Sequence, residues 1–308
     1  MKTYIVKIKP LTGFGSPIKG DTLFGHLCWQ AFEDSQLFGK SLQELLKDYE
    51  ENPFIVVSSA FPVVKEKIYL KRPSMPLYKL FKISEKEFIQ KRKELKSKNY
   101  FAFEIPLKPL NEITYEKINF IEEDSQIRCT INRLTGTTGE APFTPYTVDK
   151  IYFKTKLAIF IGLRQDIAVE SFKEALKRVG NYGYGKDATA GYGKFEVEDI
   201  KEIQLLASSG NYNALYTLSP SVPKKEEVKD IYFTPFIRFG RFGSIFAKLK
   251  NPFKNPVVFA DEAAVLIPNE DIKKPYIGMS IQNLSKAIPE AVTQGYSLVL
   301  PVEVQDAL

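Results

Sequence analysis

The chain of 308 residues is poor in the two residue types that carry much of hydrolytic and metal chemistry. It has two cysteines, Cys28 and Cys129, and one histidine, His26. The cysteines form no CxxC pair, which argues against a disulfide scaffold, a cysteine zinc site and a thioredoxin-type redox pair, and indicates a reducing compartment. A Ser-His-Asp relay, a His-based zinc site or a two-histidine ribonuclease would have to be built around His26 alone.

Long apolar runs and metal-binding motifs are also missing. The longest apolar run, LAIFIGL at 157–163, is much shorter than the ~18 residues that a membrane-spanning helix needs. HExxH and EF-hand patterns are absent, and we interpret the acidic cluster at 122–124 as a solvated loop. We therefore expect a soluble, cytoplasmic protein without a membrane partner, a metal or a cofactor.

Positive charge is concentrated in one stretch of the chain. Residues 61–108 contain thirteen basic and five acidic residues, a net charge of +8, whereas the whole chain carries +6. Prolines break this stretch into short pieces, which predicts an insertion outside the core. An EKEFIQKRKELK helix capped by Ser84 is typical of a solvated surface helix. The net charge of the whole segment nevertheless favours a polyanionic partner.

The order of patterns predicts an α+β protein in two parts. Residues 1–205 read as a strand, a loop at 13–20, a helix capped by Asp21, a further helix and strand, a hairpin over about 126–160, a helix and a closing strand. This order is compatible with a β-α-β-β-α-β, ferredoxin-like unit that contains the basic insertion at about 61–108. Residues 206–308 are richer in strands, with helix signals only at SIFAKLK and SKAIPEAV.

The segment GNYGYGKDATAGYGKF at 180–195 is the most distinctive motif. It approaches the Walker A pattern, but Asp187 stands where a Ser or Thr must bind magnesium, and the loop leaves a helix and enters a strand instead of the reverse. The same context excludes a Rossmann fingerprint. We expect free backbone N–H groups of the glycines to approach phosphates, and Tyr182, Tyr184 and Tyr192 to be available for stacking on bases.

Taken together, GDTLFGHLCW, the glycine motif, FGRFGS, NPFKNPVVF and PYIGMSI give the chain a resemblance to the RAMP superfamily of CRISPR proteins over essentially its whole length. Within it, the chain is most similar to the fourth Csm subunit of type III-A effector complexes, a relative of the Cas-five group. The resemblance implies two tandem ferredoxin-like (RRM-like) domains, the second of them degenerate because it shows few helix signals, with the hairpin as a projecting thumb.

The resemblance also implies a function and a site. Such proteins are non-catalytic and grip the 5′ repeat tag of the guide RNA, between the large polymerase-like subunit and the first backbone RAMP subunit. The implied RNA-binding residues come from the first loop, the base of the thumb and the glycine motif: Gly13, Ser16, Lys19, Gly20, Asn132, Arg133, Thr135, Gly183, Gly185, Lys186 and Gly191.

Two alternatives stay open at this point. Some guide-processing RAMP ribonucleases carry a catalytic histidine near the position of His26, so the chain could be a metal-independent endoribonuclease that uses His26 as general acid or base. A glycine-loop protein that binds a small phosphorylated ligand is the other. The basic insertion fits either RNA or a protein subunit.

Overall fold

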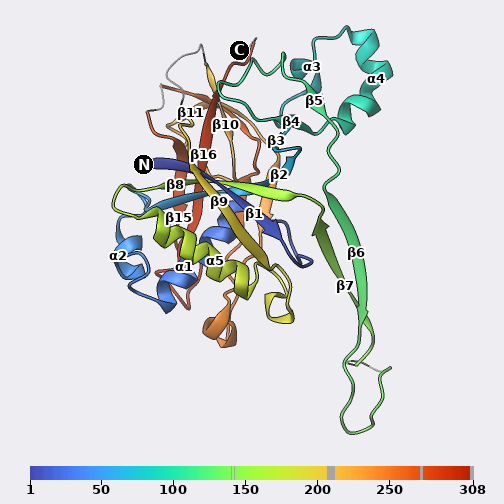
Figure 1. Ribbon diagram of the computed structural model, residues 1–308, viewed down its shortest axis with the longest axis vertical. Coiled ribbons are helices and arrows are strands. Elements are labelled where there is room, and N and C mark those ends of the chain that lie inside the picture. Colours follow the sequence, from blue (N-terminus) through green and yellow to red (C-terminus); the bar gives the residue numbers. More distant parts are fainter. Residues whose placement is uncertain (140, 142, 207–211, 271–272, 306–308) are drawn as a thin grey trace.

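The computed structural model describes residues 1–139, 141, 143–206, 212–270 and 273–305. Two antiparallel sheets and a long β-ribbon dominate it, with few helices (Figure 1), so the predicted mixture of sheets and helices is confirmed. Residues 140 and 142 of the predicted hairpin loop, and 207–211 after the predicted domain boundary, lie outside the described residues.

Seven strands form the larger sheet, in the order β5-β4-β3-β2-β8-β1-β9. Their bounds are β1 Lys2–Pro10, β2 Ile55–Val64, β3 Lys67–Lys71, β4 Tyr100–Ala102, β5 Tyr115–Glu116, β8 Lys156–Leu163 and β9 Phe195–Glu202. Every residue of β8 after Lys156 is buried, which explains its unbroken apolar sequence, because a strand covered on both faces needs no polar side.

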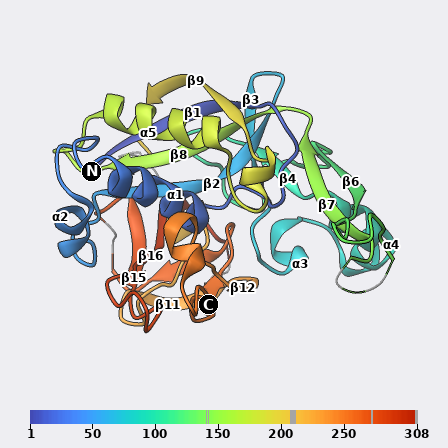
Figure 2. The same cartoon turned by 90° about the horizontal axis from the view of Figure 1, so that it is seen from below.

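Helices α1 (Gly20–Glu33) and α5 (Val169–Tyr182) lie against one another (Figure 2). α5 packs on β9, and α1 packs on β2 and also on β16 of the second sheet. The apolar stripes that the sequence places on them are buried: Leu23, Phe24, Leu27 and Ala31 on α1, and Phe172, Ala175, Leu176 and Val179 on α5.

Two predicted helix caps can be compared with the structure. The short helix α2 (Leu42–Lys47) begins at Ser41 in a capping box, as the sequence suggests. The cap predicted at Asp21 is wrong, because α1 begins at Gly20 and its N-cap is Lys19. Asp21 lies in the first turn, and its carboxylate is used in a contact with the other half of the chain.

The basic segment at 61–108 is only partly an insertion. Strand β2 continues to Val64, and β3 and β4 extend the large sheet, with Leu70 and Phe101 fully buried. Only α3 (Leu77–Leu80) and α4 (Glu85–Ser97) stand out from the body. The prolines therefore mark the ends of short sheet strands as well as surface loops.

Strands β6 (Ile121–Arg128) and β7 (Tyr146–Phe153) pair over their full length as a ribbon that projects from the body (Figure 1). The hairpin was expected at about 126–160. The difference arises because 156–163 belongs to the central sheet as β8. The acidic cluster at 122–124 lies in β6 and not in a loop, with Glu122 paired to Lys154 and Asp124 to Lys150.

The second sheet has the order β11-β14-β10-β16-β15 and is antiparallel throughout. Its strands are β10 Ala214–Thr217, β11 Val228–Tyr232, β14 Val265–Pro268, β15 Tyr276–Ile281 and β16 Thr293–Val302. Four of these strands follow one another along the chain as β10, β11, β14 and β16. Across the sheet they lie in the order β11-β14-β10-β16, that is, second, third, first and fourth. The same order holds for β2-β8-β1-β9, so the two halves repeat one strand arrangement.

Residues 212–270 and 273–305 contain no α-helix. The predicted helix at 285–292 is wrong, because Pro289 removes a backbone donor and clashes with the preceding turn in any helix interior. SIFAKLK forms only the 3₁₀ turn η2 (Ser244–Lys248), which lies between β12 (Pro235–Arg238) and its partner β13 (Val257–Ala260).

The two halves share one hydrophobic core and several buried polar contacts. Gln294 of β16 accepts a hydrogen bond from the Val57 amide and donates one to its carbonyl, at 2.9 and 2.7 Å. The guanidinium of Arg238 binds both carboxylate oxygens of the buried Asp21, at 2.6 and 2.9 Å. These contacts fix β2 and α1 against the second half of the chain.

No helix within the described residues is long and apolar enough to span a bilayer.

Candidate nucleic-acid interface

The loop between α5 and β9, residues 183–193, is called the glycine loop below. Gly183, Gly185, Gly191 and Gly193 all have positive φ. At Gly193 a side chain is also excluded by space, since a Cβ there would lie 2.1 Å from the carbonyl oxygen of Tyr184. The glycines thus serve a tight, left-handed backbone path.

The expectation that these glycines offer free N–H groups is wrong. Each of the four amides donates within the chain: Gly183 to the Val179 carbonyl, Gly185 to His26, Gly191 to the Ala188 carbonyl and Gly193 to the Gly13 carbonyl. Asp187, with φ of +61°, reverses the loop next to Lys186. Lys186 is exposed and has no ion-pair partner among the described residues, so its ammonium is the cation that this loop presents to solvent.

The tyrosines of the motif have separate roles. Tyr184 is fully buried, and its hydroxyl accepts a hydrogen bond from the Lys19 amide at 3.0 Å and donates to the Pro17 carbonyl at 3.2 Å. Burial raises the pKa of this hydroxyl. Tyr192 is buried as well and accepts a hydrogen bond from Arg128 of the ribbon. Of the three predicted stacking rings, only Tyr182 is exposed, so the prediction was wrong for the other two.

His26 connects α1 to the glycine loop. Its Nε2 accepts the Gly185 N–H at 3.0 Å, and its ring lies 5.0 Å from that of Tyr184. Burial lowers the pKa of His26 from 6.5 to about 4. The imidazole is therefore neutral near pH 7, and the lone pair that a general base would use already accepts a hydrogen bond.

This environment predicts a pH dependence of stability. Because the pKa of His26 is about 4 in the folded chain and ~6.5 when unfolded, the stabilisation is complete above pH ~6.5 and is lost as the pH falls toward 4. We expect a loss of about 2–3 kcal/mol over this interval, measured by urea unfolding as the difference between wild type and His26→Gln. No other histidine titrates in this range. Parallel pH profiles for the two proteins would contradict the assignment.

The first loop, residues 11–19, packs against the glycine loop. A Cβ on Gly15 would lie 2.6 Å from the Lys186 carbonyl oxygen, and one on Gly185 would lie 2.7 Å from the Ser16 hydroxyl. The carbonyl of Gly13 accepts the Gly193 amide at 2.9 Å. Of the residues predicted in these two loops, the structure brings together Gly13, Ser16, Gly183, Gly185, Lys186 and Gly191.

Lys19 and Gly20 face the second half of the chain instead. The Lys19 ammonium lies 2.7 Å from Glu262 and also pairs with Asp261. Although burial raises the pKa of Glu262, the charges of Lys19 and Lys71 lower it to about 2. A Cβ on Gly20 would meet the Val57 carbonyl oxygen at 2.3 Å. The N-terminus of α1 is thus packed inside the protein and is a poor site for RNA phosphates.

Asn132, Arg133 and Thr135 lie at the tip of the ribbon. They follow the end of β6 at Arg128, whereas the resemblance placed them at the hairpin's base. The difference arises because the ribbon is already paired from Ile121 onward. Asn132 is tied into the tip by accepting the Leu134 and Gly136 amides at 2.9 and 2.8 Å.

The loop between β12 and β13, called the aromatic loop (residues 239–254), was not predicted as part of the site. The rings of Phe239 and Phe253 are 75% and 63% exposed, and Arg241 lies over Phe253 at 5.7 Å. Alternation of aromatic and basic residues in FGRFGS and NPFK could have revealed it, since this is typical of base stacking beside phosphates.

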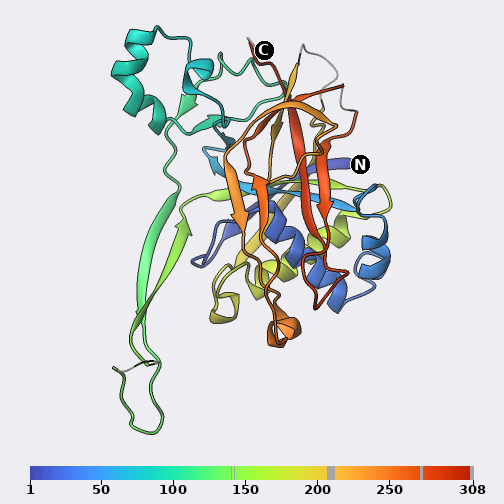
Figure 3. The same cartoon turned by 180° about the vertical axis from the view of Figure 1, so that it is seen from behind.

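The glycine and aromatic loops therefore pack on neighbouring turns in the middle of α1, and the first loop packs on the glycine loop. The glycine loop touches His26, and the aromatic loop reaches Trp29, three residues further along the helix, through Gly243 and Phe246. The first loop contacts the glycine loop directly. Figures 1 and 3 show the glycine and aromatic loops at the same end of the molecule.

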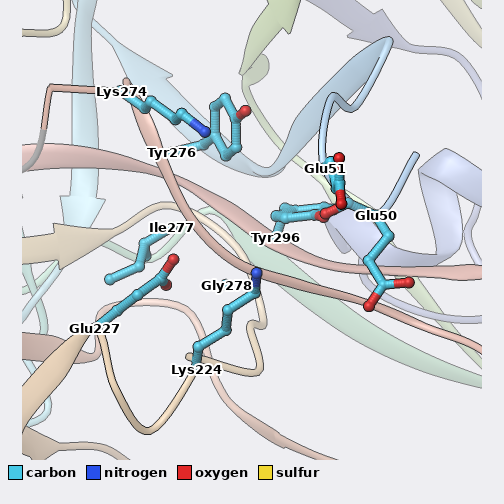
Figure 4. A pocket seen from close by; sticks show the side chains of 9 residues that line it. All are labelled: Glu50, Glu51, Lys224, Glu227, Lys274, Tyr276, Ile277, Gly278 and Tyr296. Carbon is cyan, nitrogen blue, oxygen red and sulfur yellow. The ribbon is translucent and has the colours of Figure 1, made fainter. Parts of the chain in front are cut away.

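A pocket of about 180 Å³ lies elsewhere, between the residues before β2 and strands β15 and β16 (Figure 4). Glu50, Glu51 and Glu227 line it together with Lys224 and Lys274. Three carboxylates against two lysines make it a poor site for a phosphorylated ligand. Within the described residues, no cluster of three or more His, Cys, Asp or Glu side chains could hold a metal ion.

Comparison with known proteins identifies the family of this chain. The RAMP superfamily model matches residues 9–196, which is more than half of the chain. No curated protein matches the sequence.

Solved structures with the same fold come from CRISPR complexes. A chain of a Csm1-Csm4 cassette crystallised with cA4 has a TM-score of 0.63 and 20% identity, and 100% of both chains are covered. The cassette with AMPPNP gives a TM-score of 0.62, also at 20% identity with 100% of both chains covered. A chain of the Csm3-Csm4 subcomplex of a type III-A interference complex gives 0.61 at 15% identity, covering 98% of this chain and 100% of that chain. These structures share the fold of this chain, and the family match shows that the protein belongs to the RAMP superfamily.

Proposed function

We propose that the protein is a non-catalytic RNA-binding subunit of a type III-A (Csm) CRISPR interference complex, and that it holds the 5′ repeat tag of the guide RNA. The observation that carries the proposal is that the glycine and aromatic loops pack on neighbouring turns of α1, with the first loop against the glycine loop. They present the free ammonium of Lys186, the guanidinium of Arg241 and the exposed rings of Phe239 and Phe253. Phosphate contacts combined with aromatic stacking are how proteins hold single-stranded RNA.

The protein would also bridge two other subunits. Similar chains occur in Csm1-Csm4 and in Csm3-Csm4 assemblies, which supports contacts with the large polymerase-like subunit on one side and with the backbone RAMP subunit on the other. The β6–β7 ribbon would act as the thumb near the junction of tag and spacer, with Asn132, Arg133 and Thr135 at its distal end.

In this proposal the chain has two RAMP domains of ferredoxin-like topology, residues 1–205 and 206–308. The first has the β-α-β-β-α-β order, and the repeated strand arrangement of the second sheet supports a degenerate second copy in which loops and β15 replace the helices. The cross-half contacts described above would join the domains rigidly.

The ribonuclease alternative is less well supported. It needs His26 as general acid or base, but His26 accepts the Gly185 amide and has a pKa of about 4. A neutral imidazole with its acceptor nitrogen occupied is suited to holding the glycine loop in place.

Substitutions in two of the loops should weaken RNA binding in different ways. Lys186→Ala should lower the slope of log K against log salt concentration by about 0.7, because one phosphate contact to a single strand is lost. Phe239→Ala should weaken binding by roughly 5- to 100-fold at every salt concentration with an unchanged slope, because stacking is not ionic. The measurement is fluorescence anisotropy with a labelled RNA that begins with the repeat tag.

The matched control is Lys177→Ala, which should bind like wild type. Lys177 is an exposed lysine on α5 without an ion-pair partner among the described residues. If Lys186→Ala and Phe239→Ala both bind like the control, the interface is wrong. If the RNA is cleaved at one position and His26→Gln abolishes cleavage, the ribonuclease alternative replaces the proposal.

A further inference from the structure

Helix α4 carries a one-sided row of basic side chains. Lys86, Ile89, Lys93 and Lys96 follow one another at spacings of three, four and three residues, which places them on one face, and Arg92 adjoins them. These residues are exposed, and none of the four cations has an ion-pair partner among the described residues. At 1.5 Å per residue, the row from Lys86 to Lys96 is about 15 Å long.

The other faces of α4 are already used. Glu87 pairs with Lys91 at 3.8 Å, and Glu94 with Lys98 at 2.8 Å, on a separate face. Leu95 is buried against the body. The two ion pairs lie on one face of the helix and the unpaired cations on another.

Helix α4 is capped at its start and attached to the body at its end. Ser84 and Glu87 form a capping box at its start. At its end, the Arg72 guanidinium donates to the carbonyls of Leu95 and Lys98, both at 2.8 Å. The basic row is therefore presented on a fixed support, away from the glycine loop (Figures 1 and 3).

Like charges at these spacings destabilise a helix. Lys93 with Lys96, and Arg92 with Lys96, are i,i+3 and i,i+4 pairs of equal sign, and each such pair slightly destabilises the helix. A bound polyanion would remove this cost. The short helix α3, which contacts α4, carries Tyr78, whose side chain is 66% exposed and available for stacking.

The composition of the face points to a nucleic acid more than to a protein. Lysine is depleted at the centres of protein interfaces, which are rich in apolar and aromatic groups, whereas Ile89 is the single apolar side chain in the row. A row of cations with an exposed ring nearby is typical of single-strand binding. We propose that this face of α4 is a second RNA-binding surface, which contacts the phosphate backbone of a single-stranded RNA segment outside the glycine-loop site.

The test replaces Lys86, Arg92, Lys93 and Lys96 together by Gln in the full-length chain, and measures binding of a labelled single-stranded 40-mer RNA over a range of salt concentrations. The slope of log K against log salt should fall by about 3, since each lost contact contributes ~0.7. The matched control removes the same charge at four exposed lysines elsewhere, Lys2, Lys47, Lys201 and Lys225, and should leave the slope within about 0.5 of wild type.

Equal slopes for the α4 variant and the control would overturn the proposal. This holds also if the α4 variant loses binding to a protein partner while its RNA slope stays that of the control. Circular dichroism and an unchanged unfolding midpoint establish that both variants are folded. The result is separable from the proposed function, because Lys186→Ala reports on the glycine loop and is measured on the wild-type α4 background.

Discussion

Arg238→Ala should lower the free energy of unfolding by about 3–5 kcal/mol. Asp21 is buried in the first turn of α1 and is bound by both arms of the guanidinium. Removal of Arg238 leaves a buried carboxylate without its ion-pair partner, and this pair joins the two halves of the chain. The measurement is urea unfolding at pH 7.

Arg241→Ala is the control, since Arg241 is exposed and lies over the exposed ring of Phe253. It should change the free energy of unfolding by less than about 0.5 kcal/mol. The double variant Asp21→Asn, Arg238→Met should recover part of the loss, because no unpaired charge remains buried. A loss below 1 kcal/mol for Arg238→Ala would show that the pair does not hold the halves together.

Gly193→Ala should destabilise the chain by more than about 3 kcal/mol. Its φ of +75° costs an L-residue about 1–2 kcal/mol, and the new methyl group would lie 2.1 Å from the Tyr184 carbonyl oxygen, a backbone atom that cannot move without disturbing the glycine loop. Binding of the tag RNA should weaken in parallel, because Lys186 belongs to the same loop.

Gly191→Ala is the matched control in the same loop. Gly191 has φ of +88° but nothing within 4 Å of a Cβ position, so it retains only the conformational cost of about 1–2 kcal/mol. The difference between the two variants isolates the close packing at Gly193. Equal losses would contradict the close packing of Gly193 against the Tyr184 backbone.

The sequence predicts the regular elements of this fold better than it predicts their caps and connections. The unbroken apolar run at 157–163 predicts strand β8, and apolar residues three and four positions apart predict helices α1 and α5. The Asp21 cap was wrong, because an ion pair with a residue 217 positions away competes for its carboxylate. Such long-range competition leaves no mark on the local sequence.

For the candidate site, the sequence indicated which segments take part but not which of their amides and side chains face solvent. The glycine motif was correctly singled out, yet its amides bind within the chain and Tyr184 is a buried anchor, because a tight loop must satisfy its own donors. The aromatic loop was missed because FGRFGS shows no apolar period. The sequence shows that the basic segment is positively charged, but only the structure of α4 shows which of its cations are paired with glutamates.

The central claim is that this chain holds the constant end of a guide RNA, and the most direct test is the RNA that it carries. The tagged protein is purified from cells that express it, and the 5′ ends of the bound RNA are sequenced. We predict short RNAs that share one constant 5′ sequence followed by variable sequence. Bound RNA with random 5′ ends, or no RNA above the level of a Lys186→Ala, Phe239→Ala double variant, would contradict the claim.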